Sequence, residues 1–167
     1  MVDVLDANSQ APFYQLYVSR LGVDTIGMES QKTYGHPEIF DQAFCQGGHA
    51  GPISFYDHQT KAVFATKARQ ASTGGIHQFQ FMFAQLGKKG WQVTEPFPYN
   101  EADASFTDPT ISEDGKLLYF ASNRRGGFGG YDIYRSEFLE GRWTPPVNLG
   151  EIINTNRNEV FPFLHLG

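Results

Sequence analysis

The chain of 167 residues has little of several features that would place it in a chemical class. Cys45 is its single cysteine, which excludes an internal disulfide and a metal site built from its own cysteines. No run approaches the roughly 20 apolar residues of a membrane-spanning helix, and residues 1–6 lack the apolar core of a signal peptide. Acidic residues outnumber basic ones, 18 to 13. We therefore expect a soluble chain with no nucleic-acid partner and no membrane span.

Residues that carry catalysis or bind metals are present but not grouped. The histidines show none of the short spacings of a zinc site; they are His36, His49, His58, His77 and His165. No Gly-x-Ser-x-Gly segment surrounds a serine. Residues 100–108 and 154–159 carry the oxygen atoms that calcium prefers, but without the spacing of a calcium loop. We therefore predict polar connections there, with calcium as the alternative, and no catalytic residue, no metal site and no cofactor.

The chain is rich in aromatic residues and in turn formers. Aromatic side chains make up 15% of it, and there are 18 glycines and 9 prolines. Strand-favouring residues interrupted by frequent turn formers are typical of an all-β protein. Pro109–Arg135 shows the pattern, because a tight turn at Glu113-Asp114-Gly115 and a glycine-rich loop over residues 123–130 separate its short apolar segments.

This segment has an upstream copy. Four landmarks recur in the same order at nearly constant spacing: Phe64 and Phe120 (56 residues apart), Ile53 and Ile111 (58), Trp91 and Trp143 (52), and Phe106 and Phe161 (55). Equivalent positions for the two tryptophans favour structural packing over ligand stacking. Repeats of about 40 to 50 residues made only of strands indicate the blades of a β-propeller.

Two sets of four strands follow from the apolar pattern. They are expected over residues 51–56, 61–67, 77–86 and 91–95, and over 105–112, 116–122, 131–138 and 142–147. A strand over 12–21 precedes them, followed by a connector with a short strand at 25–26 and a helical turn over 37–44, begun by Pro37. A last strand is expected over 161–164.

These strands divide the chain into four parts. Residues 1–49 are the last strands of a preceding blade with a long connector, 50–105 and 106–158 are complete four-stranded antiparallel blades, and 159–167 begin a further blade. Propellers close with about four to eight blades, so two blades cannot complete a ring. We expect either a fragment of a longer protein or two associated chains, the C-terminal strand of one pairing with the N-terminal strands of the other.

Arg124, Arg125 and Phe128 form a candidate partner-binding loop. Arginine and aromatic residues are over-represented where proteins bind partners. The alternative is that one arginine pairs with an acid of a neighbouring blade, such as Asp132. The adjacent Gly126–Gly130 does not predict a phosphate site, because a strand follows it where such a site needs a helix N-terminus.

From residue 51 onward, and most closely from Pro109, the sequence resembles the WD-repeat-like, TolB-type propeller family. The matching residues are Pro109, Ile111-Ser112, Asp114-Gly115, Lys116–Ser122, Arg124, Gly126–Gly130 and Asp132-Ile133-Tyr134. The first copy departs from this pattern at residues 56–59 and 71–75. Trp143–Gly150, together with residues 153–155 and 158–163, is similar to the propellers of OmpA-like cell-envelope proteins of Bacteroidota, some of them in type IX secretion and gliding.

The resemblance implies a non-enzymatic propeller scaffold that binds other cell-envelope proteins in the periplasm, near the outer membrane and the peptidoglycan. Peptidoglycan itself would be bound only through an OmpA-like domain, which these residues do not contain. Two alternatives stay open. One is the accessory propeller of a prolyl-oligopeptidase-type peptidase, whose catalytic triad lies in a separate domain. The other is a glycan-binding propeller.

Overall fold

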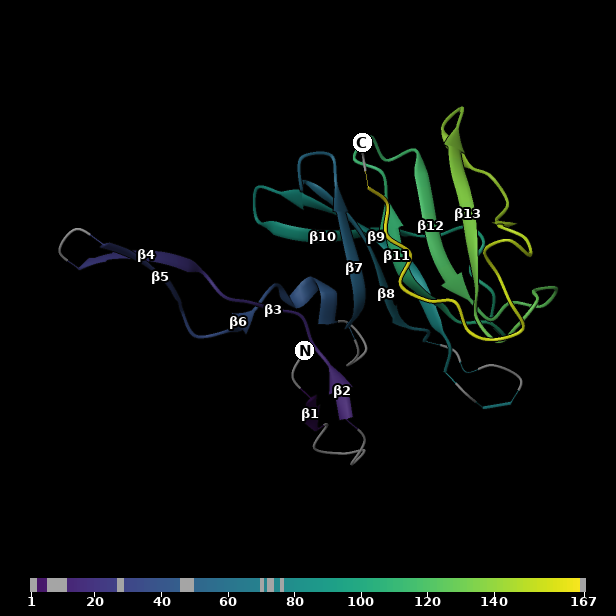
Figure 1. Ribbon diagram of the computed structural model, residues 1–167, viewed down its shortest axis with the longest axis horizontal. Helices are drawn as coiled ribbons and strands as arrows, with labels where there is room; N and C mark the ends of the chain where they lie inside the picture. Colours follow the sequence, from purple (N-terminus) through teal and green to yellow (C-terminus); the bar gives the residue numbers. More distant parts are fainter. Residues whose placement is uncertain are drawn as a thin grey trace.

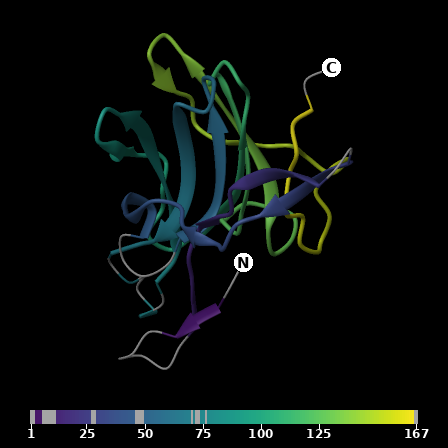
Figure 2. The same ribbon diagram turned by 90° about the vertical axis from the view of Figure 1, so that its left-hand side faces the viewer.

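The computed structural model describes residues 3–5, 12–26, 29–45, 50–69, 71, 74–75 and 77–165. His49 and part of the loop over 71–75 lie outside these ranges. The regular structure is almost entirely antiparallel β-sheet, which confirms the all-β prediction. Two larger sheets pack together, and a hairpin of β4 (Leu21–Ile26) and β5 (Glu29–Tyr34) projects away from them (Figure 1). The same hairpin comes toward the viewer in Figure 2.

The first sheet contains four strands in the order β10-β9-β8-β7. Their bounds are β7 (Ala50–Tyr56), β8 (Lys61–Lys67), β9 (Phe79–Gly87) and β10 (Gly90–Pro96). Each strand is antiparallel to its neighbours. Every bound lies within two residues of the prediction, because the alternation of apolar side chains is regular here. In β9, for example, Phe81 and Phe83 are buried.

The second sheet has its outer strand in two pieces. β11 (Phe106–Ile111), β12 (Leu117–Ser122) and β13 (Asp132–Leu139) follow one another across the sheet. Both β14 (Arg142–Trp143) and β15 (Val147–Asn148) pair with β13. The single strand expected over 142–147 is therefore wrong. Pro145 and Pro146 lack the N–H groups that a continuous strand would donate to β13.

The N-terminal predictions are also corrected. The strand expected over 12–21 is broken into β2 (Pro12–Tyr14), β3 (Tyr17–Val18) and the start of β4. Each piece has a different partner: β1 (Asp3–Leu5), β6 (Glu38–Ile39) and β5. The helical turn expected over 37–44 is only the 3₁₀ helix η1 (Gln42–Cys45), because residues 38–39 are used in the pairing with β3.

The two larger sheets repeat each other in register. Phe55 lies opposite Ala62 as Ile111 lies opposite Leu118, so the offset is 56 residues in both of the first two strands. The sequence pairing of Ile53 with Ile111 was therefore wrong by two residues. In the third and fourth strands the offset is 52 residues, since Leu86 and Trp91 pair as Phe138 and Trp143 do. The connection between the second and third strands is thus four residues shorter in the second repeat.

A bulge also recurs in the first strand of each repeat. The register shifts between Ala50 and Ile53 in β7 and between Thr107 and Thr110 in β11. In both cases three residue steps of the first strand match two of its partner, and the extra segment contains a proline, Pro52 or Pro109. Proline is tolerated in a bulge because the ladder is interrupted there.

The main core lies between the two sheets and is largely aromatic. The rings of Phe81 and Phe120 meet edge to face with centroids 5.4 Å apart. Phe83 stacks on Trp143 at 5.6 Å, with the ring planes 11° apart. Pairs of this kind stabilise a fold by about 0.5–1.5 kcal/mol each beyond the burial of their surface.

Equivalent residues of the two sheets do not face each other. Phe120 packs in the core between the sheets, whereas its equivalent Phe64 packs on the other face of the first sheet, 4.9 Å from Phe44 of η1. Trp143 and its equivalent Trp91 differ in the same way, and Trp91 lies 5.3 Å from Phe44. The two sheets therefore pack head to tail, each directing the same face at the part of the chain that precedes it.

Beyond β15 the described residues, 149–165, contain no strand. The strand expected over 161–164 is therefore not formed in this structure. That residues 159–167 begin a further blade stays a prediction. The segment is held instead by Tyr131, whose carbonyl accepts from Glu159 N at 2.7 Å, and by a hydrogen bond from Phe161 N to Asp108. Within the described ranges, no helix is long and apolar enough to cross a membrane.

Candidate functional site

The glycine-rich loop between β12 and β13 is organised around the buried carboxylate of Asp132. This side chain is 1% exposed and accepts from the backbone N–H groups of Phe128 (2.6 Å) and Gly129 (3.0 Å). It also accepts from the side-chain amide of Asn148 at 2.7 Å. The loop amides are thus occupied by a carboxylate of the chain itself, and strand β13 follows as predicted.

The loop packs tightly on the C-terminal residues 154–158, which explains the last two of its glycines. A Cβ atom at Gly129 would overlap the backbone carbonyls of Thr155 and Arg157, and one at Gly130 would overlap the Asn158 side chain. The two segments are also joined by a hydrogen bond from Gly130 N to the carbonyl of Arg157, at 2.7 Å. The glycine-rich loop and residues 154–158 therefore form one continuous surface at this end of the second sheet.

Arg124 takes part in this loop as a paired residue. Its guanidinium lies 2.5 Å from the carboxylate of Glu101, which belongs to the connection between the two sheets. It also lies over the ring of Tyr134, 5.5 Å from the centroid, and its side chain is 22% exposed. The alternative interpretation therefore holds for Arg124, although the acid is Glu101 and not Asp132. This pair ties the loop of the second sheet to the end of the first.

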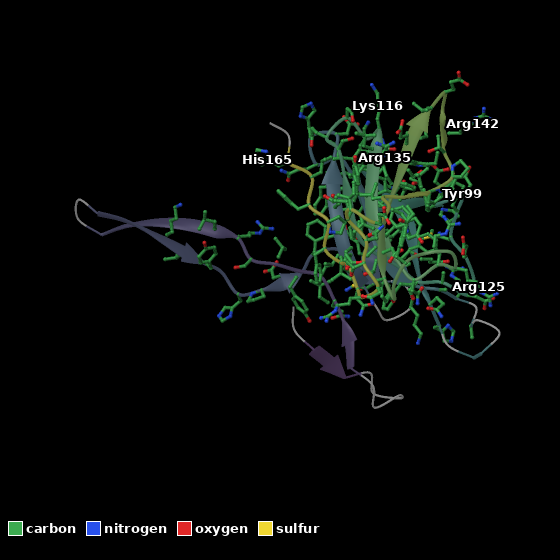
Figure 3. The ribbon with its side chains drawn as sticks, turned by 45° about the vertical axis from the view of Figure 1, so that its right-hand side comes forward. Tyr99, Lys116, Arg125, Arg135, Arg142 and His165 are labelled. Atoms are coloured by element: carbon green, nitrogen blue, oxygen red, sulfur yellow. The ribbon has the colours of Figure 1, made fainter. Side chains whose placement is uncertain are left out.

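Arg125 and Phe128 are available at the surface. Arg125 is exposed, and Phe128 is 50% exposed. Figure 3 places Arg125 at one end of the sheets and Lys116 and Arg142 at the other. We call the end that carries Arg125 the glycine-loop end. The other end, which carries the turn at residues 113–115 and is distinct from the β4–β5 hairpin, is called the hairpin end.

Ile152 and Ile153, which are not among the candidate site residues predicted from the sequence, come directly before residues 154–158 and add apolar surface. They are 93% and 49% exposed. A signal for them was available, because two adjacent β-branched residues between polar neighbours, outside any expected strand, have no role in a core. The glycine-loop end therefore displays Phe128, Ile152 and Ile153 with Arg125 on a framework of packed backbone.

The polar stretches considered for calcium use their oxygen atoms within the chain. The Asn100 side chain is bonded to the backbone of Phe81, and Asn154 to that of Ile133. Glu159 accepts from the backbone N–H and the hydroxyl of Thr155 at 2.9 and 2.6 Å. In the part of the chain that the structure describes, no cluster of three or more His, Cys, Asp or Glu residues has the arrangement of a metal site.

The comparisons with known proteins add no relative to this geometry. No protein-family model matches the chain, and no curated protein matches it either.

Proposed function

We propose that the two sheets are consecutive blades of a partial β-propeller. Their head-to-tail packing supports this, because the same face of each repeat is directed at the preceding unit. The shared register and the recurring bulges support it as well. Units that pack in this heterologous way form rings or open arrays. On the outer face of the second sheet, Tyr119, Ala121 and Ile133 correspond to residues of the first sheet that pack in the core between the sheets. Ala121 and Ile133 are already buried there, and Tyr119 is partly buried.

We further propose that this propeller is a non-enzymatic scaffold of a cell-envelope protein, acting in the periplasm near the outer membrane. The resemblance of Trp143–Gly150 and residues 153–155 and 158–163 to envelope propellers supports the location. Other envelope proteins are the proposed partners, and peptidoglycan would be reached only through a separate domain. A rigid sheet framework that displays loops at one end suits a protein that holds partners in place.

The observation that carries the scaffold function is the apolar surface at the glycine-loop end. Phe128 and Ile152 are exposed although the backbone that bears them is held in place: the glycine-rich loop by Asp132 and by the Arg124–Glu101 pair, and residues 150–154 by hydrogen bonds from Ile153 N and Asn154 N to the Gly150 carbonyl. Fixing the backbone before binding reduces the entropy that a partner contact would cost. Exposed apolar groups on an ordered loop are typical of a protein-binding surface.

The test places a photo-crosslinking phenylalanine analogue at Phe128 in protein expressed in the periplasm. The control is the same analogue at Tyr34, which is 74% exposed and lies on the projecting strand β5, away from both ends of the two sheets. We expect a discrete adduct with an envelope protein from position 128, lost in Ile152→Asp, and none from position 34. Equal adducts from both positions would contradict the proposal. Saccharide binding that weakens in Phe128→Ala would support the glycan-binding alternative instead.

A further inference from the structure

A cavity lies between the two sheets, at the hairpin end. Its volume is about 310 Å³. Both sheets contribute to its lining, chiefly through Tyr56, Lys61, Phe83, Glu95, Phe138 and Trp143. It is separate from the loop surface described above, because those loops close the other end of the sheets.

Aromatic rings form much of the wall of this cavity. Phe138 is 39% exposed and lies edge-on to Trp143, with 5.3 Å between the ring centroids. Tyr56, at the end of β7, is partly buried beside Gly115. Aromatic rings attract cations through their negatively charged faces and also bury the alkyl chain that carries the cation.

The fixed charge of the lining is negative. Glu95 is exposed and forms no ion pair with any described residue. Lys61 is the cation of the lining, and Asp57 neutralises it at 3.0 Å. Burial is the main reason that the pKa of Tyr56 is raised to about 12, and the carboxylates of Asp57 and Glu95 raise this pKa further.

A bulge in β10 brings Glu95 to the cavity. Val93 pairs with Ala84 and Pro96 pairs with Met82, so Thr94 and Glu95 together lie opposite Phe83. Such an extra residue re-aims the side chains of a strand. Both Thr94 and Glu95 line the cavity as a result, although neighbours in a regular strand point to opposite faces.

We propose that this cavity binds a primary ammonium group, carried by a lysine side chain of a partner protein. The unpaired Glu95 supplies the countercharge, and the rings of Phe138 and Tyr56 contact the alkyl chain and the cation. An anionic ligand would meet Glu95 as a like charge, and a neutral one would leave it without a partner. This site is independent of the loop surface at the glycine-loop end.

The test titrates the unmodified protein with the peptide acetyl-Gly-Lys-Gly-amide, while the indole N–H signals of its two tryptophans are followed by NMR. Trp91→Phe assigns the signals. We expect weak, roughly millimolar binding that shifts the Trp143 signal and leaves Trp91, in the other core, unchanged. The same peptide with an acetylated lysine should produce no shift. The proposal would be overturned if the indole signals of both tryptophans shifted, or if neither did. It would also be overturned if the acetylated peptide shifted the Trp143 signal.

Two variants locate the binding. Glu95→Gln removes the countercharge at an exposed position, and Phe138→Leu removes the ring but keeps an apolar side chain. We expect each to weaken binding by about 3- to 30-fold. Glu140→Gln is the matched control, because its side chain is 87% exposed outside the cavity, and it should leave affinity unchanged. Equal effects of Glu95→Gln and Glu140→Gln would show a general charge effect and overturn the site.

Discussion

Asn100 and Asn154 each make the same pair of hydrogen bonds, Asn100 to the first sheet and Asn154 to the second. Asn100 accepts from the N–H of Phe81 and donates to its carbonyl, both at 2.9 Å. Asn154 does the same with Ile133, at 2.7 and 3.0 Å. Phe81 and Ile133 are the register equivalents in β9 and β13. Each asparagine thus satisfies the backbone of a third strand where the strand next to it has ended.

Replacing these asparagines should destabilise the protein unequally. Asn154 is 1% exposed and also donates to Asn148, so Asn154→Ala should lower the free energy of unfolding by about 2–4 kcal/mol. Asn100 is only partly buried, and Asn100→Ala should cost about 1–2 kcal/mol. Urea denaturation measures both. Asn156→Ala, at an exposed neighbouring position, should cost under about 0.5 kcal/mol, and a similar loss there would contradict this role.

Gly115 is required both by its backbone and by the ring beside it. Its φ is +71°, and a Cβ atom there would lie 2.8 Å from Cε2 of Tyr56. Gly115→Ala should therefore cost about 2–4 kcal/mol, the sum of left-handed strain and overlap. Gly141 has a similar φ of +79° but open space around it, so Gly141→Ala should cost only about 1–2 kcal/mol. Thermal unfolding of the two variants measures the difference, and equal losses would exclude a contribution from Tyr56.

The turn between β7 and β8 contains three successive left-handed residues that are not glycine. They are Asp57, His58 and Gln59, with φ values of 52°, 55° and 60°. Glu113 holds the turn by accepting from His58 N at 2.6 Å. Gln59→Gly should stabilise the protein by about 0.5–1 kcal/mol, because glycine adopts this conformation without strain.

The control for Gln59→Gly is Gln92→Gly in β10, where φ is not positive. This substitution should instead destabilise the protein by about 0.5–1 kcal/mol. Denaturant titrations of the two variants therefore should move in opposite directions. A loss of stability in Gln59→Gly would show that its side chain matters more than the strain.

Stability should depend on alkaline pH through Tyr56. Its pKa is raised from the ordinary 10 to about 12 in the folded state. Below pH 10 the phenol is protonated in both the folded and the unfolded state, and its contribution to the free energy of unfolding is fully present. As the pH rises through 10 to 12, the unfolded chain releases this proton first, so the folded state loses stability. The urea midpoint should fall more between pH 9 and 11 in the wild type than in Tyr56→Phe, and parallel curves would contradict the shift.

The sequence was sufficient for the four strands of the first repeat and the first three of the second. Their apolar side chains alternate with period two, and the turns at residues 113–115 and the glycine-rich loop carry residues that only turns favour. It was not sufficient for the N-terminal strand, because Leu16 turns into the core beside Phe40. A run of strand-favouring residues does not reveal where tertiary packing interrupts it.

The candidate site was predicted only in part. Phe128 and Arg125 were identified by residue type, and both are exposed as a binding surface requires. The partner of Arg124 was not, because Glu101 lies 23 positions away and meets it only when the two sheets pack. The cavity at the hairpin end was not predicted either. It depends on a bulge in β10 that turns the Glu95 side chain toward the cavity. The alternation of apolar and polar residues in the sequence does not reveal this bulge.

The bulges at Pro52 and Pro109 determine where this repeat can change length during evolution. Each bulge holds one extra residue, so removing that residue would restore a regular ladder and leave the pairing on both sides of it unchanged. Removing a residue from a regular part of the strand would instead send every following side chain to the opposite face. The connection between the second and third strands is four residues shorter in the second copy, without a shift in register. Insertions and deletions should therefore accumulate at the glycine-loop end, where the partner surface can diversify while the stacking of the sheets is preserved.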